Sequence, residues 1–431
     1  LLMIIICITI RTHIYFQQIL LRHEMRLSCH LALGLAMSIA TTAQAADDLP
    51  SREEMWKIIQ QQQKQIETLM SGQQSNEEKI SATESKVEAT AEAVDASQTA
   101  TGSSAKKVHI GGYGELHYNN LQDNNSDAEK KEIDFHRFVL FFGYDFNDRT
   151  RFFSEVEIEH ALSGDGQPGE VELEQAYIQH DLTNYTNFKA GLFLLPVGIL
   201  NETHEPNTFY GVERNNVEKN IIPTTWWEAG LALGGRIGKG WSWDATGTSG
   251  LLTSAEDGYK PRAGRQKVAK AVANDGALTG RLKWTGVPGV ELAATFQYQS
   301  DITQGEDPTA GAATLFETHA ALLKGGFGLR ALYAQWGLDG EGPARLGADK
   351  QDGWYIEPSW RFNPSIGIFA RYEQWDNAAG DSSDSEYAQT SLGVNYWLNE
   401  NAVFKADWIA QDAPDGKTEY EGFNLGVGYS F

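Results

Sequence analysis

From residue 108 to the end of the chain, stretches of about ten to fifteen residues alternate between apolar and polar side chains. In the last stretch, 423–431, every second residue is apolar or aromatic, and those between are glycine, asparagine or serine. Successive side chains of a strand point to opposite faces, so such a strand offers one face to lipid and one to water. Hydrocarbon cannot pair with backbone groups, so strands cross it only as a closed barrel. The pattern predicts an all-β, antiparallel transmembrane β-barrel.

Sixteen such stretches are expected, and the joints between them are alternately short and long. The short joints hold glycine, proline, asparagine or aspartate, which favour turns. The longest joints are 197–225 and 253–275. Outer-membrane barrels have an even strand number, short periplasmic turns and long exterior loops, so both barrel ends are expected in the periplasm. The strands are predicted at about 108–122, 132–147, 150–163, 169–182, 186–196, 226–237, 240–252, 276–286, 289–301, 312–324, 326–337, 352–363, 365–376, 385–398, 401–412 and 419–431.

Composition supports a barrel rather than a bundle of membrane helices. Only 41% of the 431 residues are hydrophobic, which is enough for strands that need one apolar face. A soluble all-β repeat protein would use similar residues and is the alternative. A barrel of eight strands is filled by its side chains, whereas sixteen strands leave an aqueous lumen. Size therefore favours a channel for ion transport across the outer membrane.

The first hundred residues are expected to be separate from the barrel. Residues 1–24 precede a good start at Met25 and are interpreted as an upstream mis-start or leader. Residues 25–45 have the charge, short apolar core and small-residue cleavage site of a signal peptide. The only cysteines, Cys7 and Cys29, lie in this part, so the mature protein is expected to contain no thiol.

Residues 46–98 carry a heptad pattern and are predicted to form a periplasmic coiled coil, joined to the barrel by a hinge at 99–107. Ile59, Ile66, Ile80 and Val87 fall on one seam, but polar residues such as Gln73 weaken it. An unassociated helix or a flexible linker is the alternative. A stalk of this kind also suggests a second function, a structural tether between the outer membrane and the cell wall.

The alternation assigns charged side chains to the lumen, because a basic residue on the lipid face at mid-bilayer costs roughly 2–4 kcal/mol. These charges either set ion preference or pair with one another and only keep the lumen wet. The acidic Glu115, Glu155, Glu157 and Glu291 are expected to face inward as well. The basic residues predicted to face the lumen are Arg137, Lys189, Arg281, Lys283, Arg330, Arg361, Arg371 and Lys405.

The joint 197–225 carries the most specific motifs, and it follows the fifth strand, where a loop folding into the barrel would narrow the lumen. Its flanks read Phe193-Leu-Leu-Pro-Val-Gly198 and Ile221-Ile-Pro-Thr-Thr-Trp226, and the first strand holds Gly112-Tyr-Gly-Glu115. In these pieces the chain resembles the phosphate-selective porin O/P family of Gram-negative outer membranes, over essentially all of 108–431.

The resemblance implies a sixteen-stranded homotrimeric porin embedded in lipid, with a periplasmic N-terminal extension and passive flux of small ions. By position in the matching loop, Arg214 and Lys219 are candidates to meet permeating anions, or else only pin the loop to the wall. Their expected counter-charges are Glu202, His204, Glu205 and Glu213.

Lumen acids dilute the basic groups, so a general or weakly anion-preferring channel is expected rather than strict phosphate selectivity. The joint 253–275 holds a further basic cluster that gathers anions at the mouth, or binds lipopolysaccharide or neighbouring loop carboxylates. Its members are Lys260, Arg262, Arg265, Lys267 and Lys270.

Other function classes find little support. The net charge of −23 argues against a nucleic-acid partner. The histidines outside the leader are scattered along the chain, without HExxH, GxSxG or Walker motifs, so no enzyme, cofactor or metal site is predicted.

Overall fold

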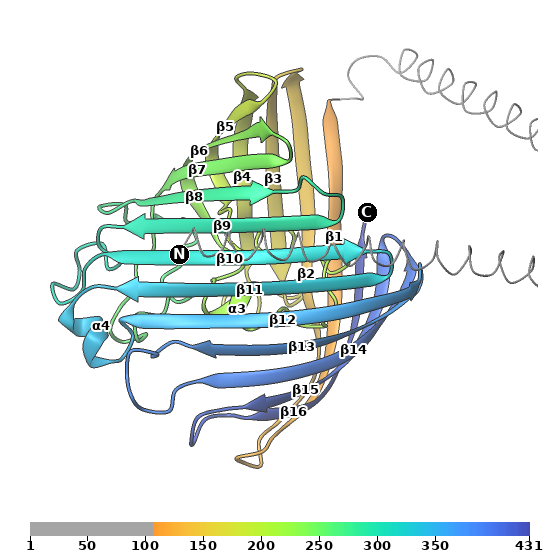
Figure 1. Ribbon diagram of the computed structural model, residues 1–431, viewed down its shortest axis with the longest axis vertical. Helices are drawn as coiled ribbons and strands as arrows, with labels where there is room; N and C mark the ends of the chain where they lie inside the picture. The colour runs from red at the N-terminus through yellow and green to blue at the C-terminus, as the bar shows by residue number, and fades with distance from the viewer. Residues whose placement is uncertain (1–106) are drawn as a thin grey trace, which may run out of the picture. The chain divides into compact units, whose positions relative to one another are not determined.

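The computed structural model describes residues 107–431, which form a closed barrel of sixteen antiparallel strands (Figure 1). Each strand pairs with its neighbours in sequence, and β1 pairs with β16 to close the cylinder. The predicted strand number and order are confirmed, and most predicted boundaries agree within a few residues. The strands are β1 (Val108–Asp123), β2 (Glu129–Asn147), β3 (Thr150–Glu159), β4 (Val171–Asp181), β5 (Thr186–Leu194), β6 (Trp227–Gly238), β7 (Trp241–Thr248), β8 (Ala277–Trp284), β9 (Val290–Gln299), β10 (Ala313–Lys324), β11 (Phe327–Leu338), β12 (Lys350–Asn363), β13 (Ile366–Asp376), β14 (Tyr387–Asn399), β15 (Ala402–Asp412) and β16 (Tyr420–Ser430).

The seam between the two ends of the barrel is closed by regular backbone pairing. Phe431 donates its N–H to the Gly112 carbonyl at 2.9 Å and accepts the Gly112 N–H at 3.0 Å. No helix within 107–431 is long and apolar enough to cross a bilayer. The signal peptide, the coiled coil and nearly all of the hinge lie outside the described residues, so those expectations stay predictions.

The joints alternate as expected. One rim of the barrel carries short turns such as 148–149 and 325–326, and the other carries long loops such as 195–226 and 249–276. Two short helices lie in the long joints: α3 (Val217–Asn220) and α4 (Glu341–Arg345). The alternation of apolar and polar residues reappears as alternating exposure, most clearly in β9. There Phe296 is 53% exposed on the outer face, while Thr295 and Gln297 are each 1% exposed inside.

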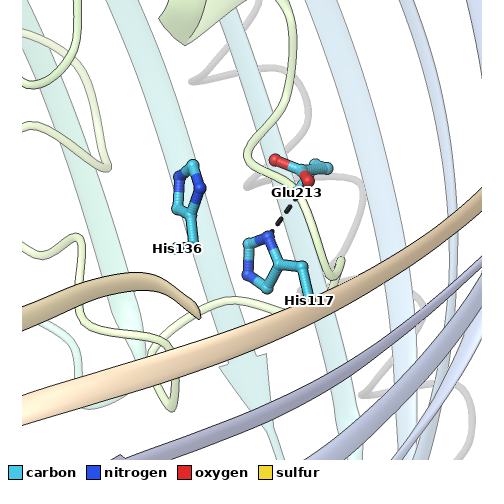
Figure 2. Close-up of side chains that lie close together, drawn as sticks. All are labelled: His117, His136 and Glu213. Carbon is cyan, nitrogen blue, oxygen red and sulfur yellow. Dashed lines mark hydrogen bonds and ion pairs between the residues drawn. The ribbon is translucent and has the colours of Figure 1, made fainter. Parts of the chain in front are cut away.

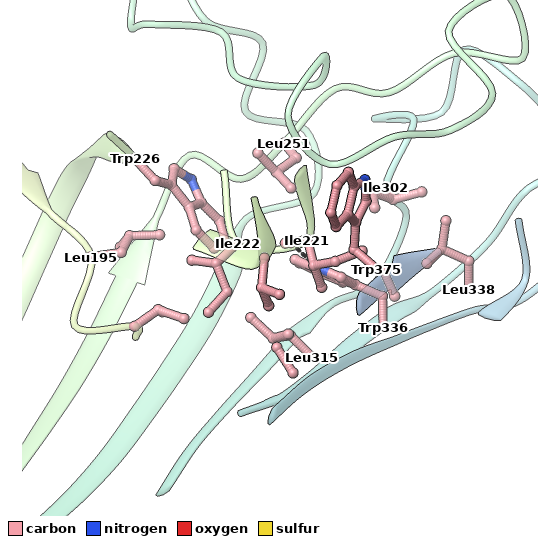
Figure 3. Close-up of a cluster of buried hydrophobic side chains, with 14 of the residues drawn as sticks. Leu195, Ile221, Ile222, Trp226, Leu251, Ile302, Leu315, Trp336, Leu338 and Trp375 are labelled. Carbon is pink, nitrogen blue, oxygen red and sulfur yellow. Dashed lines mark hydrogen bonds between the residues drawn. The ribbon is translucent and has the colours of Figure 1, made fainter. Parts of the chain in front are cut away.

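One part of the lumen is not lined as the alternation predicted. The loop 195–226, here called the inward loop, folds into the barrel and packs apolar side chains against β10 to β13 (Figure 3). Trp336 of β11 and Leu315 of β10 point inward and are fully buried against Ile221 and Ile222 of the loop. The expectation of a hydrated inner face throughout was wrong here, because the loop supplies an apolar surface that excludes water.

Candidate functional site

The inward loop is held at both ends by one buried amide. Asn201 donates from Nδ2 to the carbonyls of Leu195 and Trp226, at 2.8 and 2.9 Å, and accepts the Trp226 N–H at 2.7 Å. Deeper in the loop, Glu218 accepts the N–H groups of Ile199 and Leu200, each at 2.6 Å. Buried backbone donors need such partners, so these two side chains let an irregular loop remain inside the barrel.

Charged side chains of the barrel wall bind the backbone of the inward loop. Arg137 on β2 donates to the His204 carbonyl at 3.0 Å, and Arg330 on β11 donates to the Thr208 carbonyl at 2.7 Å. Lys405 on β15, a strand that lies between β2 and β11 around the barrel, donates to the Gly211 carbonyl at 2.8 Å. Three predicted lumen-facing cations therefore face inward and anchor the loop on both sides of the barrel.

The other predicted lumen cations also lie on the inner wall, mostly beside acids or aromatic rings. Arg281 pairs with Glu202 and Asp244. The remaining contacts are Lys189 over the Tyr177 ring at 5.0 Å, Lys283 with Glu291 at 3.7 Å, Arg361 over the Trp397 ring at 4.1 Å, and Arg371 with Glu357 and Glu373 at 3.2 and 3.3 Å. Most of these cations are compensated locally, as the pairing alternative anticipated.

The four residues expected as counter-charges of Arg214 and Lys219 form no ion pair with either of them. Glu202 pairs with Arg281, and Glu213 lies 3.1 Å from Nδ1 of His117. His204 lies between two wall carboxylates, described below, and Glu205 forms no ion pair within 107–431. The sequence could not show this, because the true partners lie on strands far away in the chain.

Arg214 and Lys219 themselves line two adjoining lumen cavities of about 130 and 260 Å³. Arg214 donates to Thr225 Oγ1 at 2.9 Å, and Lys219 is exposed. Neither forms an ion pair with any residue of the described barrel. Lys219 is open to the lumen, but the surrounding loops and wall reduce its hydration, and this, together with nearby Arg262, lowers its pKa, although Glu213 opposes the shift.

The loop 249–276, here called the cover loop, adds basic groups to the smaller cavity. Arg262 donates to the Thr224 carbonyl at 2.8 Å, and Arg265 donates to the Thr225 carbonyl at 2.5 Å. Burial, and to a lesser extent Arg265, lowers the pKa of Arg262 to about 10. Lys267 binds the carboxylates of Glu170 and Glu172. Of the roles expected for this basic cluster, Lys267 therefore shows the binding of neighbouring carboxylates. Lys260 and Lys270 of the same cluster are exposed and do not line these cavities.

Three histidines that seemed scattered in the sequence are neighbours in space. The rings of His117 and His136 stack with their centroids 4.6 Å apart, and the ring of His160 meets that of His136 edge-on at 5.9 Å. Glu213 reaches His117 from the inward loop (Figure 2), and Asp134 lies 2.8 Å from Nδ1 of His160. The register of β1, β2 and β3 brings them together. Pairing the predicted hairpins residue by residue could therefore have revealed this histidine cluster from the sequence.

These features define a class of protein. A sixteen-stranded barrel with an apolar outer face, a folded-in loop and a charged lumen is an outer-membrane channel rather than an enzyme. Residues 108–424 match the family model for phosphate-selective porins O and P, and the chain belongs to that family. The family and the fold indicate a Gram-negative outer membrane.

The chain is also similar to a sequence relative and, in its fold, to solved structures of porins. An uncharacterized protein of Aquifex aeolicus (strain VF5) is 31% identical over 344 residues, which are 72% of this chain and 77% of the relative. The Pseudomonas putida OprB structure matches with a TM-score of 0.54 at 12% identity, over 76% of this chain and 95% of OprB. An anion-selective porin from Comamonas acidovorans matches with a TM-score of 0.53 at 12% identity, over 75% of this chain and 99% of that porin. These structures show the fold.

Proposed function

We propose that this protein is a passive diffusion porin for small hydrophilic solutes, with a weak preference for anions. One observation carries the preference. Of the six cations that line the 130 Å³ cavity between the inward loop, the cover loop and the wall, four form no ion pair within 107–431. They are Arg214, Lys219, Arg262 and Arg265. A cation without a direct ion-pair partner in a low-dielectric cleft raises the local concentration of anions around it.

The preference is weak because acidic groups line the same cavity. Six basic residues face six acidic ones there, so the formal charges sum to zero. The cations come mainly from the two loops, while most of the acids lie on β1, β3 and β4. A permeating ion therefore crosses between a basic side and an acidic side, which orients water and favours neither sign strongly.

Phosphate selectivity is the narrower alternative, and the contacts of the arginines weigh against it. Recognition of phosphate uses several free donors, often a bidentate arginine fork. Here Arg262 and Arg265 already donate to loop carbonyls, so part of each fork is occupied. We propose assembly as a homotrimer in outer-membrane lipid, as the family resemblance implies. The tether function rests on residues 46–98, which lie outside the described part of the chain.

The test is the reversal potential of single channels in a planar bilayer under a salt gradient. Replacing Arg214 and Lys219 with alanine leaves the cavity with a formal charge of −2 and should move the reversal potential toward cation preference. The Debye length is about 10 Å at 0.1 M salt and 3 Å at 1 M, so the shift should be large in dilute salt and small in concentrated salt.

Lys270→Ala is the matched control, because it removes a cation from the cover loop outside both cavities. An equal shift in the control, or no shift in the double variant, would remove the basis for the anion preference. Replacing chloride with phosphate in the same measurement separates a general anion preference from a phosphate preference. No conductance from intact, folded protein would contradict the channel function itself.

A further inference from the structure

A buried cluster between the inward loop and strands β3 and β4 contains polar atoms without hydrogen-bond partners. His204 of the inward loop lies between Glu155 of β3 and Glu174 of β4, and all three side chains are at most 3% exposed. Nε2 of His204 is 3.5 Å from Oε1 of Glu155 and 3.6 Å from Oε2 of Glu174. None of these three atoms forms a hydrogen bond within the described residues. Buried polar atoms are rarely left in this state, so three that converge on one point indicate a missing partner.

The spacing of these atoms fits a metal ion better than a direct hydrogen bond. A charge-assisted N–H···O contact is about 2.7–2.9 Å long, well short of the separations here. Ligand atoms at about 2.1 Å from a tetrahedral ion lie roughly 3.4 Å from one another, which is close to both observed distances. The three atoms lie within 4.8 Å of one another, so one ion can reach them all.

Hydrogen bonds with neighbouring residues orient the side chains of His204 and Glu155 toward the centre of the cluster. Nδ1 of His204 lies 3.0 Å from the Asn201 carbonyl, so Nδ1 carries the proton and Nε2 presents a lone pair to the cluster. The amide of Asn201 is itself held by the two ends of the inward loop. The second oxygen of Glu155 accepts a hydrogen bond from Gln175 at 2.6 Å, which fixes the orientation of that carboxylate.

The local charge also calls for a cation. Glu157 is buried beside Glu174, so three carboxylates gather here, while nearby Arg137 is already paired with Glu115 at 2.5 Å. A bound dication would compensate this charge.

We propose that His204, Glu155 and Glu174 bind a divalent first-row transition metal ion, with Zn²⁺ as the reference case, which fastens the inward loop to β3 and β4. One imidazole and two carboxylates suit Zn²⁺, whereas Ca²⁺ and Mg²⁺ take oxygen ligands in larger number. The cluster of His117 and His136 differs, because its histidines already lie within hydrogen-bond distance of carboxylates, at 3.1–3.2 Å. One of the ligands, Glu174, also lines the 130 Å³ cavity, but the metal site does not rest on the ion preference proposed above.

The test is the metal content of folded porin in detergent after incubation with ZnSO₄ and gel filtration. Wild-type protein should retain about one Zn²⁺ per chain, with an X-ray absorption spectrum of one imidazole and oxygen ligands at about 2.0–2.2 Å. The Glu155→Gln/Glu174→Gln variant keeps the size of both side chains and should lose this ion. His136→Gln is the control for zinc bound at the cluster of His117 and His136, and it should retain the ion.

Two results would overturn the proposal: wild-type protein without bound zinc, or zinc that is lost in the His136→Gln variant but kept in the double variant. Substitution of Co²⁺ into wild-type protein does not depend on any variant folding. A visible absorption band typical of four- or five-coordinate Co²⁺ is the expected result, and a spectrum of octahedral, solvated Co²⁺ counts against a buried site. Neither readout requires conductance, so this proposal and the proposed function fail separately.

Discussion

The packing of the inward loop can be tested by shortening one buried side chain, Ile221. This residue is fully buried in the apolar cluster inside the lumen, and its carbonyl accepts the indole N–H of Trp336 at 2.9 Å. Ile221→Ala removes three carbons, worth about 2.4 kcal/mol at 0.8 kcal/mol per buried group, before the cost of the cavity is added. The total of roughly 3 kcal/mol should raise the population of the detached loop about a hundredfold.

Hydrogen exchange of folded porin in detergent, read by mass spectrometry, measures this detachment directly. Peptides from 195–226 should exchange faster, whereas peptides from β14 and β15 should not change. Ile356→Ala is the matched control, because Ile356 is 41% exposed on the outer face of β12, where detergent or lipid fills the space left. Unchanged exchange in the inward loop, or an equal rise in the control, would refute the view that the apolar cluster holds the loop.

Two further changes probe the loop and the lumen charge. Gly198 has φ +74°, and a Cβ there would lie 2.5 Å from Oε1 of Glu218, so Gly198→Ala should speed loop exchange roughly tenfold or more. Gly416→Ala has a similar φ of +72° and open space around it, so it separates backbone strain from the clash, and a similar effect in both would contradict this explanation. Burial opposes ionisation of Glu213, but His117 outweighs it and holds the pKa of Glu213 well below its usual range. A carboxyl with a lowered pKa stays charged as the pH falls, so Glu213→Gln should increase anion preference as much at about pH 5 as at pH 7; a shift confined to pH 7 would contradict this.

The fold was accessible from the sequence because its signal is local and repeated. The period of two, the turn residues and the alternating joint lengths each recur many times, so errors at single strands do not alter the count. The ends of β3 and β7 were placed too late, at 163 and 252 instead of 159 and 248, because the loops that follow begin with apolar residues such as Leu162, Leu251 and Leu252, which resemble strand residues in the sequence. The fate of the inward loop was also predicted, from its place after the fifth strand.

The partners of the site residues were not accessible in the same way. Glu202 contacts Arg281, and His204 contacts Glu155, through pairings that depend on where the loop crosses the lumen. The contact of Trp336 was not predictable either, because the sequence shows this residue only as one of many inward-facing residues of a strand. Only the folded loop shows that it faces an apolar partner, Ile221, rather than water.

The sequence alone determined that this chain closes into a sixteen-stranded barrel with an oily outside, because a bilayer forces a period that every strand must repeat. The tertiary structure decided what occupies the lumen: which charges are paired, which stay free, and where histidines and carboxylates converge. The physical reason is that lumen contacts join residues distant in the chain through an irregular loop, and no periodic pattern encodes such contacts.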